Sequence, residues 1–213
     1  MNKLIIIGAG SVGKFIAYNI DDFESEFSIV GFVDDDVTKQ GQIIAGYPVL
    51  GSLDLLQEYS GKGYAVAVGI AFPKVKYKIL ERIINLDFAF PNFISKKAWL
   101  SNEVVVGNGS IIYPGVAINY ETLIGDFVVM NMNCAIGHNC IIRSYTSLAP
   151  GVNLGGFTIL HEAVDFGIGA ATKQNVVVHQ NTIVGGQAML THNISANEIV
   201  VGVPGKVKKN MIL

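Results

Sequence analysis

The sequence has few charged residues and no run of basic ones. Only 15% of its 213 residues are Asp, Glu, Lys or Arg, and the formal net charge is −2. Because a nucleic-acid-binding surface needs a basic patch that neutralises phosphates, nucleic acid is excluded as an expected partner. Half of the residues are hydrophobic, which excludes the disordered class and predicts a fully folded chain.

Long hydrophobic runs are also lacking. The apolar segment 1–7 leads directly into Gly8, Gly10 and Gly13, where a signal peptide would continue its apolar region towards a small-residue cleavage site. No stretch approaches the roughly 18 to 20 uninterrupted apolar residues that span a bilayer. We therefore expect no signal peptide, no membrane partner and a cytoplasmic protein.

Cysteine is scarce as well. Cys134 and Cys140 are the two cysteines, and neither a CxxC motif nor a Cys/His ligand spacing is present. Two thiols do not make a disulfide framework, and this spacing gives no metal site. We expect both to be buried as small hydrophobic side chains, and we expect no metal cofactor.

The first element in the sequence is a strand followed by a glycine turn. The β-branched run 3–7 ends in Gly8-Ala9-Gly10-Ser11-Val12-Gly13, and Phe15, Ile16 and Ile20 follow at helical spacing. A glycine turn between a strand and a helix allows backbone N–H groups to approach a phosphate. This segment therefore predicts a nucleotide-binding turn.

A second predicted strand, 28–33, ends in Asp34-Asp35-Asp36, about 20 residues beyond the glycines, where a carboxylate commonly binds a ribose. The alternative is a tight strand-to-helix turn with a solvated acidic loop. A further strand, 64–68, meets Gly69, and a helix over 74–84 follows. The resulting α/β domain, residues 1–95, is too small for the two halves of a dinucleotide site, so a single nucleotide is expected.

The rest of the chain, residues 96–213, contains a six-residue repeat. Every sixth residue from Val106 to Leu190 is apolar except Thr172, and the residue four positions after each is small or β-branched. This period predicts short parallel strands stacked into a β-helix. If three six-residue units make one triangular coil, residues 18 apart lie in neighbouring coils, about 4.8 Å from each other. Roughly five coils are expected between about 100 and 195, with a short tail after Pro204.

Among the four histidines, His138 is the candidate catalytic residue. It follows Gly137 at an outward turn and has polar neighbours, and an imidazole suits general-base chemistry near neutral pH. His192 lies three coils later in the same column, and His161 and His179 lie on another face. We interpret these three as surface or interface residues.

Several motifs, in this order, resemble those of the hexapeptide-repeat sugar-nucleotide acyltransferases. This family includes the N-acetyltransferase of UDP-N-acetylbacillosamine synthesis and the sialic-acid-type O-acetyltransferases. The matching stretches cover nearly the whole chain and lie at 8–13, 31–35, 65–69, 136–140, 148–151 and 201–206.

The resemblance implies a Rossmann-like domain followed by a left-handed β-helix, a homotrimer, acetyl-CoA as co-substrate, and His138 as the base for direct attack of a sugar amine. It implies a catalytic role for Asn131 and Asn139, and an oxyanion-binding N–H at Gly156. It also implies coenzyme contacts at Ser147, Ile168 and Gly186. The implied nucleotide-sugar contacts are Gly8, Gly10, Ser11, Val12, Asp34, Asp35 and Gly69.

Three positions depart from the family pattern. Asn139 stands where the family has Asp or Glu, and an amide can fix a histidine tautomer but carries no charge. Glu121, 18 residues earlier in the same column, is an alternative source of that charge, and the sequence leaves the choice open. Val12 and Ser147 stand where the family often has histidine.

These features favour the transfer of an acetyl group to an amino group of a nucleotide-linked deoxy sugar. The amino group is expected at C4, and the product is expected to serve surface-polysaccharide or glycan synthesis. Sugar O-acetylation is an alternative, although a hydroxyl is a weaker nucleophile and would depend more on a charged base. A non-catalytic nucleotide-sugar-binding scaffold is a third interpretation. The sequence does not distinguish UDP, dTDP and GDP.

Overall fold

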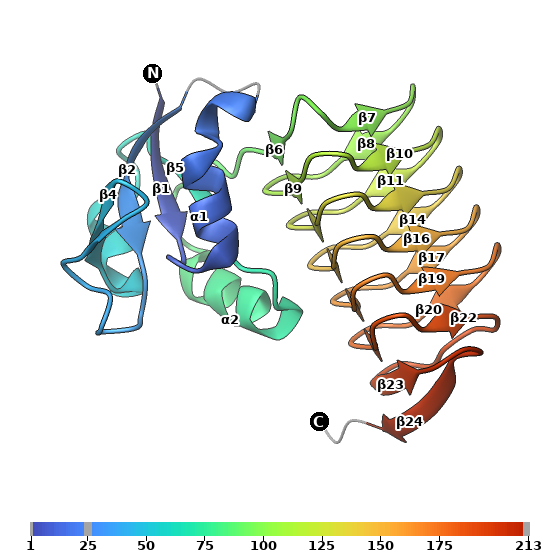
Figure 1. The fold of residues 1–213 in the computed structure, drawn as a ribbon. Coiled ribbons are helices and arrows are strands. Elements are labelled where there is room, and N and C mark those ends of the chain that lie inside the picture. The colour runs from blue at the N-terminus through green and yellow to red at the C-terminus, as the bar shows by residue number, and fades with distance from the viewer. Residues whose placement is uncertain (1, 24–26, 211–213) are drawn as a thin grey trace. The chain divides into compact units, whose positions relative to one another are not determined.

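The computed structural model describes residues 2–23 and 27–210, which form two compact units, Met1–Phe93 and Ile94–Leu213 (Figure 1). The first unit is a mixed sheet with two α-helices, and the second is a stack of short strands. In the described part of the chain, no helix is long and apolar enough to cross a membrane.

The sheet of the first unit has the strand order β3-β4-β2-β1-β5. Strand β1 lies between β2 and β5 and pairs in parallel with both, whereas β3 pairs antiparallel with β4. Because β1 and β5 are buried, their sequences are nearly continuous apolar runs, as parallel strands require. The strands are β1 (Asn2–Ile7), β2 (Phe27–Val33), β3 (Ile43–Ile44), β4 (Tyr47–Gly51) and β5 (Ala65–Val68).

Two α-helices and two 3₁₀ turns complete this unit: α1 (Ser11–Tyr18), η1 (Ile20–Asp22), η2 (Leu53–Glu58) and α2 (Pro73–Ile83). Helix α1 is shorter than the apolar spacing of the sequence predicts, because Ile20, which fits that spacing, belongs to η1. The Asn19 side-chain amide donates to the Phe15 carbonyl at 2.8 Å and ends the helix there. The hairpin of β3 and β4 was not predicted from the sequence.

The second unit confirms the predicted parallel β-helix, and its three sheets are consistent with the left-handed form. From β6 to β20, each coil contributes one two-residue strand to each sheet (Figure 1). We name the sheets D, E and F. Sheet D contains β6 (Phe93–Ile94), β9 (Ile111–Ile112), β12 (Val129–Met130), β15 (Ser147–Leu148), β18 (Asp165–Phe166), β21 (Ile183–Val184), β23 (Glu198–Val201) and β24 (Lys206–Asn210).

Sheet E contains β7 (Trp99–Leu100), β10 (Ala117–Ile118), β13 (Ala135–Ile136), β16 (Asn153–Leu154), β19 (Ala171–Thr172) and β22 (Met189–Leu190). Sheet F contains β8 (Val105–Val106), β11 (Leu123–Ile124), β14 (Ile141–Ile142), β17 (Ile159–Leu160) and β20 (Val177–Val178). Residues 18 apart pair between successive coils, as in Ala135 with Asn153. The predicted tail after Pro204 includes β24, which pairs antiparallel with β23.

The core of the β-helix follows the repeat found in the sequence. The second residue of each two-residue strand from β9 to β22 is buried, including Thr172 at 6% exposure. Every residue four positions later, from Val116 to Ile194, is also buried, as is Ser110, four positions after Val106. The large and small residues therefore alternate inside the β-helix, while exposed side chains lie in the turns and at the first position of several strands, such as Trp99 and Leu123.

Candidate functional site

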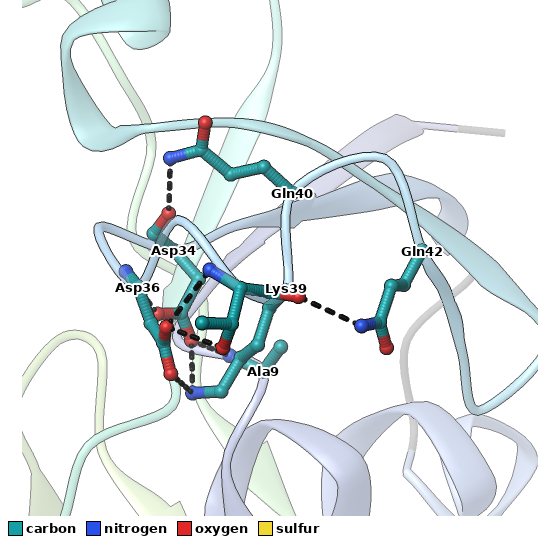
Figure 2. Close-up of polar contacts among 7 residues, drawn as sticks. Ala9, Asp34, Asp36, Lys39, Gln40 and Gln42 are labelled. Atoms are coloured by element: carbon teal, nitrogen blue, oxygen red, sulfur yellow. Dashed lines mark hydrogen bonds and ion pairs between the residues drawn. The ribbon is translucent and has the colours of Figure 1, made fainter.

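The glycine turn of the first unit is attached to the acidic loop by Asp34. The backbone N–H of Ala9 donates to Asp34 Oδ2 at 2.8 Å, and Lys39 Nζ lies 2.9 Å from the same oxygen (Figure 2). The N–H of Asp36 donates to Asp34 Oδ1 at 2.9 Å. Burial raises the pKa of Asp34, but these three donors outweigh it and hold the pKa below its ordinary value.

Asp35 has a different set of partners. The Leu53 N–H donates to Asp35 Oδ1 at 2.9 Å, and Arg82 forms ion pairs with both Asp35 and Asp54. The Leu53 N–H and, less strongly, Arg82 hold the pKa of Asp35 below its ordinary value despite partial burial. Both carboxylates are therefore ionised and held in place at neutral pH.

A cavity of about 400 Å³ opens between the glycine turn and α2. It brings together three of the predicted nucleotide residues, Gly8, Asp34 and Asp35. Its walls are mostly apolar, and Lys78 and Arg82, four residues apart on α2, add positive charge. These two cations were not predicted from the sequence, although their spacing places them on one helix face. The remaining lining residues are Ile7, Val33, Leu53, Ile70, Val75 and Ile79.

The other predicted nucleotide residues have different surroundings. A Cβ added at Gly10 would meet nothing within 4 Å, so this side of the turn is open to a ligand. Gly13 and Gly69 instead serve packing, because a Cβ at Gly69 would lie 2.7 Å from the Cα of Gly13. Ser11 begins α1 and is exposed, whereas Val12 lies on its buried face.

Replacing Asp34 with asparagine is expected to loosen the glycine turn. The variant loses the Lys39 ion pair and weakens the bond from Ala9, so the free energy of unfolding should fall by about 1–3 kcal/mol at pH 7. Because the folded-state pKa is lowered, the stabilisation is present above the unfolded pKa of about 3.9 and is lost as the pH falls through the folded pKa. Urea unfolding of parent and variant between pH 7 and pH 3 measures this.

The exposed Asp36 supplies the control, and Asp36→Asn should have a smaller effect. An equal loss of stability in both variants, or a difference that does not shrink below about pH 4, would contradict the role assigned to Asp34.

In the β-helix, His138 lies in the turn between β13 on sheet E and β14 on sheet F. The turn is fixed by contacts with both neighbouring coils: the Asn139 N–H donates to the Tyr120 carbonyl at 3.0 Å, and the Phe157 N–H donates to the His138 carbonyl at 2.9 Å. Below it, Thr122 Oγ1 donates to the Gly137 carbonyl at 3.1 Å. The half-buried imidazole is therefore held on a rigid scaffold.

Three side chains and one glycine surround the imidazole, and a fourth side chain, Glu121, contacts one of the three. The Tyr120 ring stacks on it with centroids 5.3 Å apart, and the Phe157 ring meets it edge-on at 5.0 Å. His138 Nδ1 lies 2.8 Å from Asn139 Oδ1, and the Asn139 amide donates to Glu121 Oε2. Gly156 lies over the opposite nitrogen, since a Cβ added there would be 2.8 Å from Nε2.

These contacts leave one ring nitrogen accessible for chemistry. The amide oxygen of Asn139 can only accept, so Nδ1 of a neutral His138 must carry the proton and Nε2 must hold the lone pair. Gly156 keeps the space next to Nε2 free of side-chain atoms. The sequence singled out both residues but gave no signal for the aromatic pair Tyr120 and Phe157.

The structure brings His138, Asn139 and Gly156 together, but Asn131 lies in another turn, between β12 and β13. There Asn131 Oδ1 accepts from the Met132 N–H at 2.8 Å. Ile168 and Gly186 are exposed, 18 residues apart in the turns that join sheet D to sheet E, and Ser147 begins β15 on sheet D. The predicted coenzyme residues thus lie along sheet D and the turns that follow it.

Cys134 and Cys140 are buried and free, as predicted from the sequence. Burial raises the pKa of Cys134 to about 11 and also raises that of Cys140. Both thiols are therefore neutral at physiological pH and are poor nucleophiles. Among the residues that the structure describes, no group of three or more His, Cys, Asp or Glu side chains could hold a metal.

Comparison with known proteins identifies the family. Residues 3–83 match the model of the PglD N-terminal domain. GDP-perosamine N-acetyltransferase from Escherichia coli O157:H7 is 30% identical over 186 residues, which is 83% of this chain and 80% of that protein.

Two solved structures resemble the whole chain. The acetyltransferase domain of PglB from Neisseria gonorrhoeae is 28% identical with a TM-score of 0.89, over 97% of this chain and 100% of that one. PerB from Caulobacter crescentus in complex with CoA and GDP-perosamine is 26% identical with a TM-score of 0.87, over 98% of both chains. These similarities, together with the repeat and the glycine turn, show that the chain belongs to the PglD-type family of hexapeptide-repeat sugar-nucleotide N-acetyltransferases.

Proposed function

We propose that this protein transfers the acetyl group of acetyl-CoA to an amino group, at C4, of a nucleotide-linked deoxy sugar. The observation that carries the proposal is the His138 site, in which Nδ1 is hydrogen-bonded to Asn139 and Nε2 faces the space left by Gly156. Such a site can accept a proton from an amine as the amine attacks a thioester. Complexes of the relatives support the choice of substrates, because PerB was solved with CoA and GDP-perosamine and the PglB domain with acetyl-CoA.

In the proposed mechanism, the amine nitrogen forms a bond to the thioester carbonyl carbon while His138 Nε2 takes one of its protons. Negative charge develops on the carbonyl oxygen, and the backbone N–H of Gly156 is our candidate donor to it. The carbon–sulfur bond then breaks, and the CoA sulfur leaves with the proton from the imidazolium. Acyl transfer is direct, and His138 returns to its starting tautomer.

In this proposal the nucleotide occupies the cavity bounded by Gly8, Asp34 and Asp35. The apolar walls suit the face of a base, the two carboxylates suit ribose hydroxyls, and Lys78 and Arg82 suit phosphates. We further propose a homotrimer in the cytoplasm, in which the coenzyme contacts Ser147, Ile168 and Gly186. Asn131 is proposed to contact substrate from its own turn.

Release of free CoA thiol tests the proposal. With acetyl-CoA present, we expect thiol release with a GDP-, UDP- or dTDP-linked 4-amino sugar and none with the corresponding 4-hydroxy sugars. Mass spectrometry should detect a product heavier by one acetyl group on nitrogen. Turnover with hydroxyl acceptors alone would favour O-acetylation, and binding of nucleotide sugars without any turnover would favour the scaffold interpretation.

A further inference from the structure

Glu121, Asn139 and Phe157 occupy equivalent places in successive coils of the β-helix. Each is the third of the four residues that join sheet E to sheet F. All three adopt a left-handed backbone, with φ of 54°, 56° and 58° in that order. Glu103 comes one coil before Glu121 with the same conformation, at φ 61°. Because this backbone repeats in register, the side chains of neighbouring coils are stacked on one another.

The stack fixes the orientation of the Asn139 amide. Glu121 Oε2 can only accept, so the Asn139 group next to it must be the NH₂, and the group next to His138 must be the oxygen. A flipped amide would place two acceptors against each other at Glu121. The orientation at His138 is therefore set by a carboxylate one coil away.

The same contacts connect a negative charge to the imidazole. Glu121 accepts from Asn139, and Asn139 in turn accepts from Nδ1–H of His138. An amide that donates to a carboxylate is polarised, which makes its oxygen a stronger acceptor for the next donor. When Nε2 takes up a proton, the imidazolium formed is stabilised by this chain.

Resting on the function proposed above, we propose that Glu121 is the positioning residue of His138 and acts through Asn139. The residue that directly follows His138 is an amide without charge, and the negative charge is supplied by Glu121 from the preceding coil. Glu121 is exposed, so solvent screens its charge. We therefore expect it to stabilise the imidazolium less than a carboxylate bonded directly to His138 would.

Exchanging the two functional groups tests this chain of contacts. Glu121→Gln keeps an acceptor for Asn139 but removes the charge, so kcat/KM at neutral pH should fall roughly 10-fold. The acidic limb of its pH profile should move to lower pH, because the imidazolium loses the negative charge that stabilises it. Glu103→Gln is the matched control in the same stack and should behave like the parent.

The double variant Glu121→Gln/Asn139→Asp carries the carboxylate next to His138 and the amide one coil earlier. The introduced glutamine can donate to the introduced aspartate, so activity and the pH profile should return to within about threefold of the parent. A merely structural role of Glu121 would give no shift of the pH profile and no rescue.

Two outcomes overturn the inference while leaving the proposed function intact. In the first, Glu121→Gln has the same kcat/KM and pH profile as Glu103→Gln. In the second, Glu121→Gln is impaired and the added Asn139→Asp does not rescue it. If His138→Ala is itself fully active, the proposed function fails instead. Should a variant lose its cooperative thermal transition, ¹⁵N NMR of the parent decides the matter: a neutral His138 protonated at Nε2 contradicts the arrangement, and one protonated at Nδ1 supports it.

Discussion

His138→Ala is expected to lower kcat by roughly 10²- to 10⁴-fold, with little change in the affinity for the nucleotide sugar. In the proposed mechanism the imidazole takes a proton only as the amine attacks, so its removal acts on the transition state. The cavity proposed for the nucleotide has all of its lining residues in the first unit and none in the β-helix. Steady-state thiol release and isothermal titration with the nucleotide sugar measure the two quantities separately.

His192→Ala is the matched control for this experiment. His192 follows β22 in the same kind of turn, three coils after His138, and is exposed. We expect its removal to leave kcat unchanged. Loss of nucleotide-sugar binding with an unchanged kcat in His138→Ala would place His138 in substrate recognition and remove it from the proton transfer.

The second large effect is expected from a single methyl group. In Gly156→Ala the new Cβ would lie 2.8 Å from His138 Nε2 and 3.0 Å from Cε1, closer than atoms that are not bonded normally approach. The ring cannot retreat without disturbing its stacking on Tyr120 or its bond to Asn139. A displacement of this size should reduce kcat by roughly 10²-fold, and the methyl also fills the space that we propose for the amine.

Gly51→Ala separates this effect from the general cost of adding a methyl group, because there the nearest atom, Leu55 Cδ2, is at an ordinary 3.4 Å. Thermal unfolding should show a modest loss of stability for Gly156→Ala, about 1–3 kcal/mol as for other overpacked sites. An active Gly156→Ala enzyme would mean that Nε2 does not face the reacting amine.

The repeat illustrates what could be predicted from local sequence. A six-residue period with one large and one small inward position determines the strand length, the coil and the column of each residue, because every coil repeats the same geometry. For this reason the place of His138 in an outward turn, and the stacking of Glu121 with Asn139, followed from counting residues. The hairpin of β3 and β4 and the strand β24 carry no such repetition and were missed.

The contacts around the imidazole required the three-dimensional structure. Counting places Tyr120 and Gly156 one coil on either side of His138, but it does not give the ring orientation, which depends on χ angles and on the stacking with Tyr120. The direction of the Asn139 amide depends on a hydrogen bond to Glu121 that no spacing rule specifies. The cations Lys78 and Arg82 likewise became part of a site only where α2 packs beside the acidic loop.

The sequence alone determined the class of both units and the family, because glycine turns, buried strands and coil repeats are encoded in residues close to one another in the chain. The tertiary structure decided which atoms meet: Ala9 with Asp34, Asp35 with Arg82, and Nε2 of His138 with the space beside Gly156. The physical reason is the separation along the chain of the residues that determine each feature. A period or a turn is set by sterics within a few residues, whereas a tautomer, an ion pair or an open nitrogen depends on side chains that only folding brings within a few ångströms.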